Sequence, residues 1–94
     1  MATLRIEHTV HDYDNWKQQF DNDPADRKGS GVRSYRVSRS ASEPNHVFID
    51  LDFDDSPSAQ KMLDKLQEVW AGPAMNLIVN PSATIVEQVE SVDL

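Results

Sequence analysis

Residues 3–20 read TLRIEHTVHDYDNWKQQF, a segment in which the spacing of apolar residues changes from one period to another. Over residues 3–10 every second side chain belongs to one face, the period of a half-buried strand. The side chains of that face are Leu4, Ile6, His8 and Val10. Asp12 then offers an N-cap, and aromatic residues at helical spacing predict a helix from about 13 to 22. These aromatic residues are Tyr13, Trp16 and Phe20.

The middle of the chain predicts a β-hairpin. Alternation returns over residues 32–40 and again over 46–54, and Glu-Pro-Asn at 43–45 is typical of a turn. A hairpin centred near residue 43 places odd-numbered residues opposite odd-numbered ones. Arg36 then opposes Asp50 as a favourable cross-strand charge pair.

A second helix is expected after the hairpin. Ser56 is its expected N-cap, with Pro57 in the first turn, and an apolar stripe of helical spacing follows. The stripe consists of Ala59, Met62, Leu63, Leu66, Val69 and Trp70. The helix is therefore expected to end near Trp70.

A last strand completes the pattern. The helix is broken at residues 71–73, and residues 74–79 are apolar enough for a short helical turn or a packed loop. A β-branched run over residues 82–90 then predicts a strand, with Ile85 and Val89 on one side. The expected order is β-α-β-β-α-β.

Each predicted helix has one apolar stripe, so both are expected to cover the same face of a four-stranded sheet. Right-handed crossovers then predict an α+β, ferredoxin-like sandwich with the antiparallel strand order 4-1-3-2 and a single domain over residues 1–94. The opposite face stays open. Its expected side chains are Arg5, Glu7, Thr9, Ser34, Arg36, Phe48, Asp50, Asp52, Thr84 and Val86.

The composition argues against several partners. The 94 residues include 9 basic and 16 acidic side chains, a formal charge of −7, which repels nucleic-acid phosphates and anionic membrane surfaces. Without cysteine there is neither a disulfide framework nor a thiolate metal site. No segment approaches the roughly 20 apolar residues of a membrane span, and the first ten residues lack a signal-peptide pattern. We therefore expect a cytoplasmic protein without nucleic-acid or membrane partners.

Several short motifs resemble those of one protein group. They are His8-Thr9-Val10-His11-Asp12-Tyr13, Trp16-Lys17, Phe20-Asp21, Gly31-Val32, Tyr35-Arg36-Val37 and Pro44-Asn45. Together they are similar to small dimeric α+β-barrel proteins, the relatives of antibiotic-biosynthesis monooxygenases, many of them known only as "cyclase-like". The resemblance implies a homodimer joined sheet to sheet, with a small-molecule pocket between the sheet and the helices of each protomer.

The chain departs from part of that group. Cofactor-free quinone-forming members and haem-degrading members resemble one another in using an Asn with a Trp, and the haem degraders add a His on the second helix. Residues 58–70 of this chain contain neither His nor Asn, and only Trp70 can stand in for the tryptophan. The resemblance therefore supports neither haem nor another cofactor here.

His8 is the candidate catalytic residue. It falls on the helix-facing side of the first strand, close to where Trp16 is expected to pack. An imidazole there has the chemistry of a base near neutral pH, which oxidation or cyclisation of a phenolic or enolisable substrate requires. The alternative is a buried structural histidine whose ring nitrogens are satisfied by backbone groups or by Tyr13.

Aromatic residues are the candidates for binding a flat, small aromatic substrate. They are Tyr13, Trp16, Phe20, Tyr35 and Trp70. An aromatic stripe at helical spacing is equally explained by core packing without any ligand. Both interpretations stay open at the level of the sequence.

Two patterns with metal-like spacing do not predict a metal site. The Asp-x-Asp-x-Asp run at residues 50–54 resembles a calcium loop, but Asp55 stands where a glycine is required and Lys61 where a glutamate is required. His8 and His11 are three residues apart at the end of a strand and therefore face opposite sides. No third zinc ligand is evident.

Two functional hypotheses follow. The first is a homodimer of α+β barrels that binds an aromatic or polyketide-like molecule and acts as a cofactor-independent monooxygenase or cyclase, with His8 as the base. The alternative is a non-catalytic binding or stress-response module whose own side chains fill the gap between helices and sheet. A ligand pocket in that gap would distinguish them.

Overall fold

The computed structural model describes residues 1–22, 27–72 and 78–94. Within these ranges the elements are β1 (Ala2–Val10), α1 (Tyr13–Asp21), β2 (Ser34–Arg39), β3 (His46–Phe53), α2 (Ser56–Trp70) and β4 (Ile78–Glu87). This is the predicted β-α-β-β-α-β order. The turn or loop expected at residues 74–79 falls mostly outside the described residues, as does part of the connection expected after α1.

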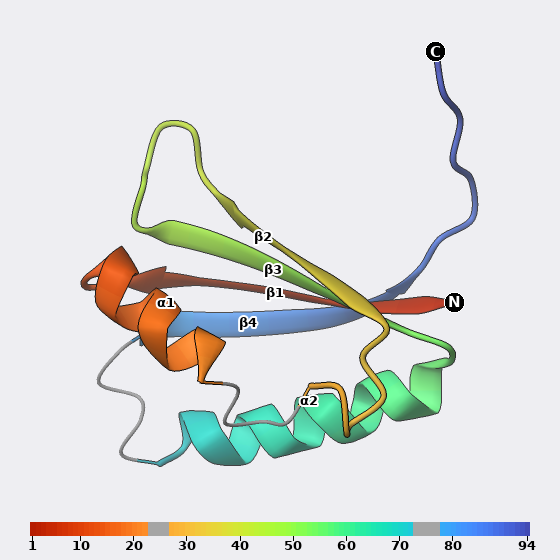
Figure 1. The fold of residues 1–94 in the computed structure, drawn as a ribbon, viewed down its shortest axis with the longest axis horizontal. Helices are drawn as coiled ribbons and strands as arrows, with labels where there is room; N and C mark the ends of the chain where they lie inside the picture. Colours follow the sequence, from red (N-terminus) through yellow and green to blue (C-terminus); the bar gives the residue numbers. More distant parts are fainter. Residues whose placement is uncertain (23–26, 73–77) are drawn as a thin grey trace.

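The four strands form one antiparallel sheet in the order β2-β3-β1-β4. This is the predicted order 4-1-3-2 read from the other edge. The hairpin register is also as predicted, because Arg36 is paired with Asp50 and Tyr35 with Leu51. Both helices lie on the same side of the sheet (Figure 1). The ferredoxin-like prediction is thereby confirmed.

Both helices begin after an aspartate. The carboxylate of Asp12 accepts hydrogen bonds from two backbone N–H groups of α1, at 3.0 and 3.3 Å, as expected of an N-cap. The N-cap of α2 is Asp55, whose carboxylate accepts from the backbone N–H of Ser58 at 2.9 Å. The expectation of Ser56 was wrong by one residue. The helix starts one residue earlier because the Asp55 carboxylate accepts a hydrogen bond from a backbone N–H group of the first turn. Pro57 also lies in this turn, and it has no N–H group that needs a partner.

The last strand begins earlier than predicted. β4 starts at Ile78 and continues through Asn80 and Pro81, which in the sequence look like a turn. Asn80 adopts a φ of 52°, and the pairing with β1 shifts between Glu7 and Thr9. Such a bulge takes up the extra residues and lets the strand continue.

The last strand also ends earlier than predicted, at Glu87. Ile85 pairs with Leu4 of β1. Val89, which was expected to share its face, lies beyond the strand and is 97% exposed. Residues 88–94 leave the sheet as an extended tail (Figure 1).

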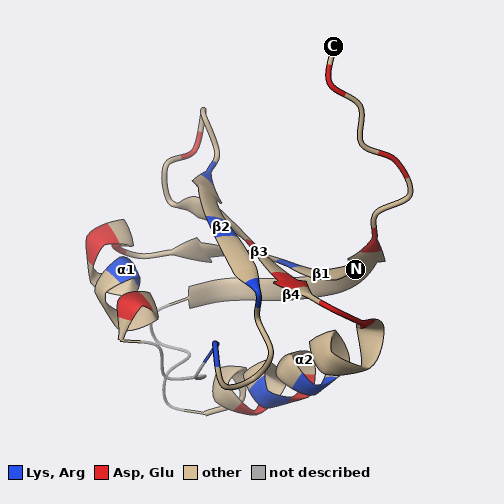
Figure 2. Ribbon diagram, turned by 45° about the vertical axis from the view of Figure 1, so that its right-hand side comes forward, with Lys and Arg blue, Asp and Glu red and all other residues tan. Residues whose placement is uncertain are grey.

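The core lies between the sheet and the helices. The sheet contributes buried side chains from alternate positions of β1 and β3: Leu4, Ile6, His8, Val10, Val47, Ile49, Leu51 and Phe53. Trp16 of α1 and Met62 of α2 are buried against them. The charged residues of α2 lie on its side away from the sheet (Figure 2). Each apolar stripe therefore faces the same layer of the sheet. Neither described helix is long and apolar enough to cross a bilayer.

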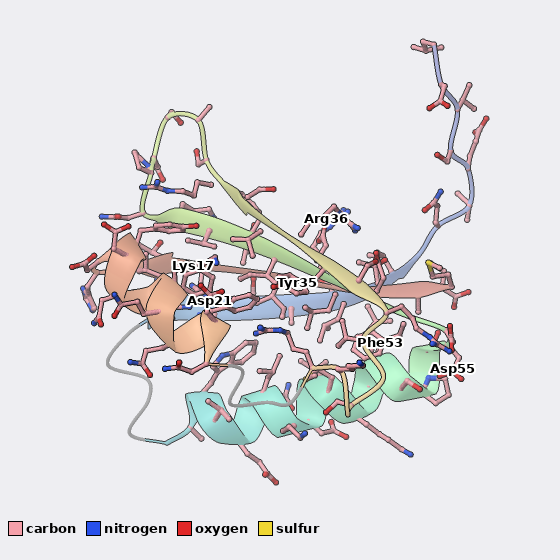
Figure 3. The ribbon with its side chains drawn as sticks, in the orientation of Figure 1. Lys17, Asp21, Tyr35, Arg36, Phe53 and Asp55 are labelled. Carbon is pink, nitrogen blue, oxygen red and sulfur yellow. The ribbon has the colours of Figure 1, made fainter. Side chains whose placement is uncertain are left out.

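The opposite face of the sheet carries ion pairs. Arg36 donates to Asp52 at 2.8 Å and lies 3.7 Å from Asp50, which in turn accepts a hydrogen bond from Arg5 at 3.1 Å. Arg36 and Tyr35 point to opposite sides of β2 (Figure 3). The hydrogen bonds from Arg36, more than any other partner, hold the pKa of the Asp52 carboxyl well below its usual range.

Candidate functional site

A pocket of about 260 Å³ lies between the sheet and the two helices. Most of its wall is apolar, with Ile49 and Leu51 from β3 and Met62 and Leu66 from α2. The two tryptophans of the chain also line it. Apart from their indole groups, the polar side chains that line it within the described residues are His8, Gln19 and Arg27. A concave apolar site with a few polar groups is the usual form of a small-molecule site.

His8 is the buried polar group of this pocket. Its side chain comes from β1, and the residue is only 4% exposed. Burial lowers the pKa of the imidazole to about 4, while the backbone of Thr9 raises it and the nearby His46 side chain lowers it further. The ring is therefore neutral at pH 7. Its Nδ1 atom has no hydrogen-bond partner among the described residues.

A row of rings begins at His8 and continues along α1. The His8 and Trp16 rings meet edge to face, with 5.4 Å between centroids. Trp16 and Phe20, one helical turn apart, stack with 5.1 Å between centroids and 29° between planes. All three line the pocket, and Trp70 of α2 lines it as well. Four of the six predicted site residues thus border one cavity.

The other two, Tyr13 and Tyr35, do not line this pocket. The Tyr13 and Trp16 rings are in contact, with 5.9 Å between their centroids. The guanidinium of Arg39 lies 4.0 Å from the centroid of the Tyr13 ring. Tyr35 lies on the edge strand β2, where its ring meets Phe20 at 5.5 Å. Each tyrosine therefore contacts an aromatic ring that lines the pocket without lining the pocket itself.

Two polar residues of the pocket, Gln19 and Arg27, were not predicted as site residues from the sequence. The helical spacing could have predicted Gln19, because it lies three residues after Trp16 and so on the same side of α1. No pattern in the sequence indicates Arg27. It lies in the connection between α1 and β2, where no periodicity indicates which way a side chain points.

A second, larger depression lies beside the pocket. This outer cleft has a volume of about 680 Å³ and is lined by residues 27–28 and 31–35, by Asp54 and Asp55 after β3, and by Ser58 of α2. Its acidic and basic side chains include Arg33 and Asp54, which form an ion pair at 2.6 Å. Arg27 lines both the outer cleft and the pocket. It therefore lies at the boundary between the two.

The carboxylates considered for calcium have other partners. Asp50 and Asp52 pair with arginines, Asp54 pairs with Arg33, and Asp55 caps α2. Over residues 1–22, 27–72 and 78–94, no group of three His, Asp or Glu side chains is arranged to hold a metal ion.

The fold occurs in several solved structures. SnoaB, a cofactor-independent oxygenase from Streptomyces nogalater, matches with a TM-score of 0.74 and 14% identity over 97% of this chain and 95% of SnoaB. A variant of MhuD with two manganese protoporphyrin IX molecules bound per active site has a TM-score of 0.73 and 14% identity over 99% of both chains. An antibiotic biosynthesis monooxygenase has a TM-score of 0.65 and 8% identity, over 96% of this chain and 100% of its own.

This chain has the antibiotic biosynthesis monooxygenase-like fold. The resemblance found in the sequence is thus confirmed at the level of the fold. No protein-family model and no curated protein matches the sequence. At identities this low, the likeness concerns the fold, and any activity has to be argued from the site.

The MhuD structure holds a metal porphyrin, but a porphyrin such as haem does not fit the pocket of this chain. The volume of about 260 Å³ lies below the range of roughly 300–1,000 Å³ that drug-sized ligands occupy, and a porphyrin is larger than those. Among the described residues, the one imidazole that lines the pocket is that of His8 on β1, and α2 contains no histidine.

Proposed function

We propose that the chain binds a small, flat aromatic molecule in the pocket between the sheet and the helices. A volume of about 260 Å³ suits a ligand of one or two fused rings. Trp16 and Phe20 line the pocket, and an aromatic ligand that contacts their rings gains both buried area and ring contacts. The existence of this pocket favours a ligand-binding protein over one whose own side chains fill the gap.

The unpartnered Nδ1 atom of His8 is the observation that carries the proposal. A buried polar atom without a hydrogen bond costs about 1–3 kcal/mol, and such atoms are rare in folded proteins. Because this atom is buried in the free protein, the imidazole would have to turn its Nδ1 atom toward the pocket, where a hydroxyl group on the ligand would supply the missing bond. The preferred ligand is therefore a hydroxylated aromatic, such as a phenol or a hydroquinone.

The finer proposal is cofactor-independent oxygenation or cyclisation with His8 as the base. Removing a proton makes a phenolic or enolisable ring electron-rich, so that it can donate electrons to dioxygen or close a ring. With a pKa of about 4 for His8 against about 10 for a phenol, this transfer costs ~8 kcal/mol before any attraction between the ions. Turnover at about 10 s⁻¹ corresponds to a barrier of ~16 kcal/mol, which leaves room for this step. The shared fold with SnoaB is consistent with it as an analogy.

Binding without chemistry is the second candidate, and the lowered pKa of His8 favours it. A neutral imidazole with so low a pKa is a weak base but still a hydrogen-bond acceptor or donor. In this case the pocket would hold the same class of ligand and leave it unchanged.

One experiment separates the two candidates. Oxygen uptake is measured with a panel of hydroquinones, corrected for autoxidation, while binding is followed by quenching of tryptophan fluorescence. The matched variants are His8→Ala, which removes the buried imidazole, and His11→Ala, which removes an exposed one. Uptake lost only in His8→Ala supports catalysis. Binding without uptake supports the second candidate, and the absence of both overturns the proposal.

We also propose that the protein is a homodimer joined through the open face of the sheet. Phe48 and Val86 are half-buried apolar side chains on that otherwise polar and charged face. The tail beyond β4 exposes further apolar side chains, Val89, Val92 and Leu94. A second copy would cover apolar groups that a lone chain leaves to water.

A further inference from the structure

Arg27 is the one charged side chain that lines the pocket, as far as the described residues go. Its guanidinium lies 4.0 Å from the centroid of the Phe20 ring and 4.8 Å from that of Tyr35. Its Nη1 atom donates a hydrogen bond to the Phe20 carbonyl oxygen at 2.7 Å. The cation is thus held against the aromatic wall, and it is attracted to the face of each ring.

Arg27 and His8 are joined by the row of rings on α1. His8 contacts Trp16, Trp16 stacks on Phe20, and Phe20 lies under Arg27, with separations of 5.4, 5.1 and 4.0 Å. A flat ligand lying along this row would meet a neutral imidazole toward one end and a cation toward the other. The two ends therefore select different chemical groups.

The surroundings of the two ends differ in their access to water. His8 is 4% exposed, so an anionic group placed beside it would lose its hydration without gaining a cation as partner. Arg27 borders the outer cleft of about 680 Å³, where an anion remains partly hydrated. A guanidinium also matches a carboxylate in planar geometry and forms charge-assisted hydrogen bonds with it.

Resting on the proposed function, we infer that the ligand is an aromatic carboxylate whose carboxyl group is bound by Arg27 at the mouth of the pocket. The ring system then extends along Trp16 and Phe20, and its far hydroxyl reaches His8. Arg27 determines specificity in this arrangement and takes no part in proton transfer. The class of ligand is accordingly a two-ring hydroxylated aromatic acid, because a single-ring acid is too short to reach along the row of rings from Arg27 to His8.

The test compares two probes of nearly equal shape, 2-naphthoate and 2-naphthamide, by isothermal titration calorimetry. The variants are Arg27→Gln and, as a matched control, Lys28→Gln. Lys28 carries the same charge at the neighbouring position but lines only the outer cleft. For the wild type we expect the carboxylate to bind about 10- to 100-fold more tightly than the amide, with a ratio that falls as salt is added.

In Arg27→Gln this ratio is expected to fall close to one while the amide binds as before, which also shows that the pocket remains folded. In Lys28→Gln the ratio is expected to stay near that of the wild type. A wild-type ratio near one, with the amide bound, overturns the role of Arg27 and leaves the pocket proposal standing. The role of Arg27 is also overturned, with the pocket proposal left standing, if Arg27→Gln keeps the wild-type ratio or if Lys28→Gln loses it. If neither probe binds the wild type, the proposed function fails together with this inference.

Discussion

The imidazole of His8 meets the indole of Trp16 with 5.4 Å between ring centroids and 69° between ring planes. The contact joins β1 to α1, so the polar group of the pocket and its aromatic wall depend on one another. A change that moves the helix exposes the imidazole to water. A change that charges the imidazole places a cation inside the core. Stability and ligand binding are therefore both expected to respond to these two residues.

Acid should destabilise the protein through His8. The unfolded imidazole binds its proton near pH 6.5 and the folded one near pH 4, so the unfolded state binds more protons between these values. The free energy of unfolding is expected to fall by ~3 kcal/mol as the pH decreases from 7 to 4. Urea titrations at several pH values measure it. In His8→Gln this part of the pH dependence should vanish, and an unchanged slope in that variant would contradict the assigned burial.

Removing the Trp16 side chain should strongly destabilise the fold. Trp16 is the buried residue of α1 and contacts His8, Tyr13 and Phe20. Trp16→Ala is expected to lower the free energy of unfolding by about 3–5 kcal/mol, and Trp16→Phe by less, because it leaves a smaller cavity. Denaturant titrations compare the two. Equal stability of Trp16→Ala and the wild type would refute the packing of α1 described above.

The open face of the sheet should depend more on Asp52 than on Asp54. Asp52 is buried and accepts hydrogen bonds from Thr3, Ser34 and Arg36, whereas Asp54 is exposed and paired with Arg33. Asp52→Asn is expected to cost about 1–3 kcal/mol of stability at pH 7. The matched change Asp54→Asn is expected to have no measurable effect, since exposed ion pairs contribute little. The reverse ranking in thermal melts would show that the network is misassigned.

The Asp52 network also has its own pH window. The folded-state pKa of this carboxyl is depressed, so its contribution is present above the unfolded value of 3.8 and is lost as the pH falls below it. The loss of stability due to Asp52 therefore begins near pH 4, where the loss of stability due to His8 is nearly complete. Acid unfolding of His8→Gln should therefore start at lower pH than that of the wild type.

Light scattering should give the mass of two chains at micromolar concentration. Phe48→Lys places a charge on the open face of the sheet, where its cross-strand neighbour Glu7 can pair with it within one chain. The variant is expected to have the mass of one chain and to remain folded by circular dichroism. A wild type with the mass of one chain would defeat the dimer proposal.

The strand order and hairpin register could be predicted because they depend on binary patterns. One buried face per strand and one apolar stripe per helix leave few arrangements, and the Arg36–Asp50 pairing followed from the turn position. The start of β4 could not be predicted, because Asn80 and Pro81 have turn chemistry and only pairing with β1 makes them a bulge.

The candidate site was predictable in part for a similar reason. Periodicity indicates which face of an element a residue occupies, and that placed His8, Trp16 and Phe20 toward the gap. It does not indicate how far along the face a cavity extends, so Tyr13 and Tyr35 could not be separated from the pocket residues. Arg27 lies in an irregular connection, and only the folded chain brings it to the Phe20 ring.

The nitrogen chemical shifts of the His8 ring test the central claim most directly. In ¹⁵N-labelled protein at pH 7, Nδ1 is recorded by long-range proton–nitrogen correlation with and without saturating 2-naphthol. We predict a neutral imidazole in the free protein and a saturable shift of Nδ1 on binding, while the nitrogens of exposed His11 stay unchanged. A His8 ring that is protonated at pH 7, or an Nδ1 signal that 2-naphthol leaves unmoved, would contradict the account.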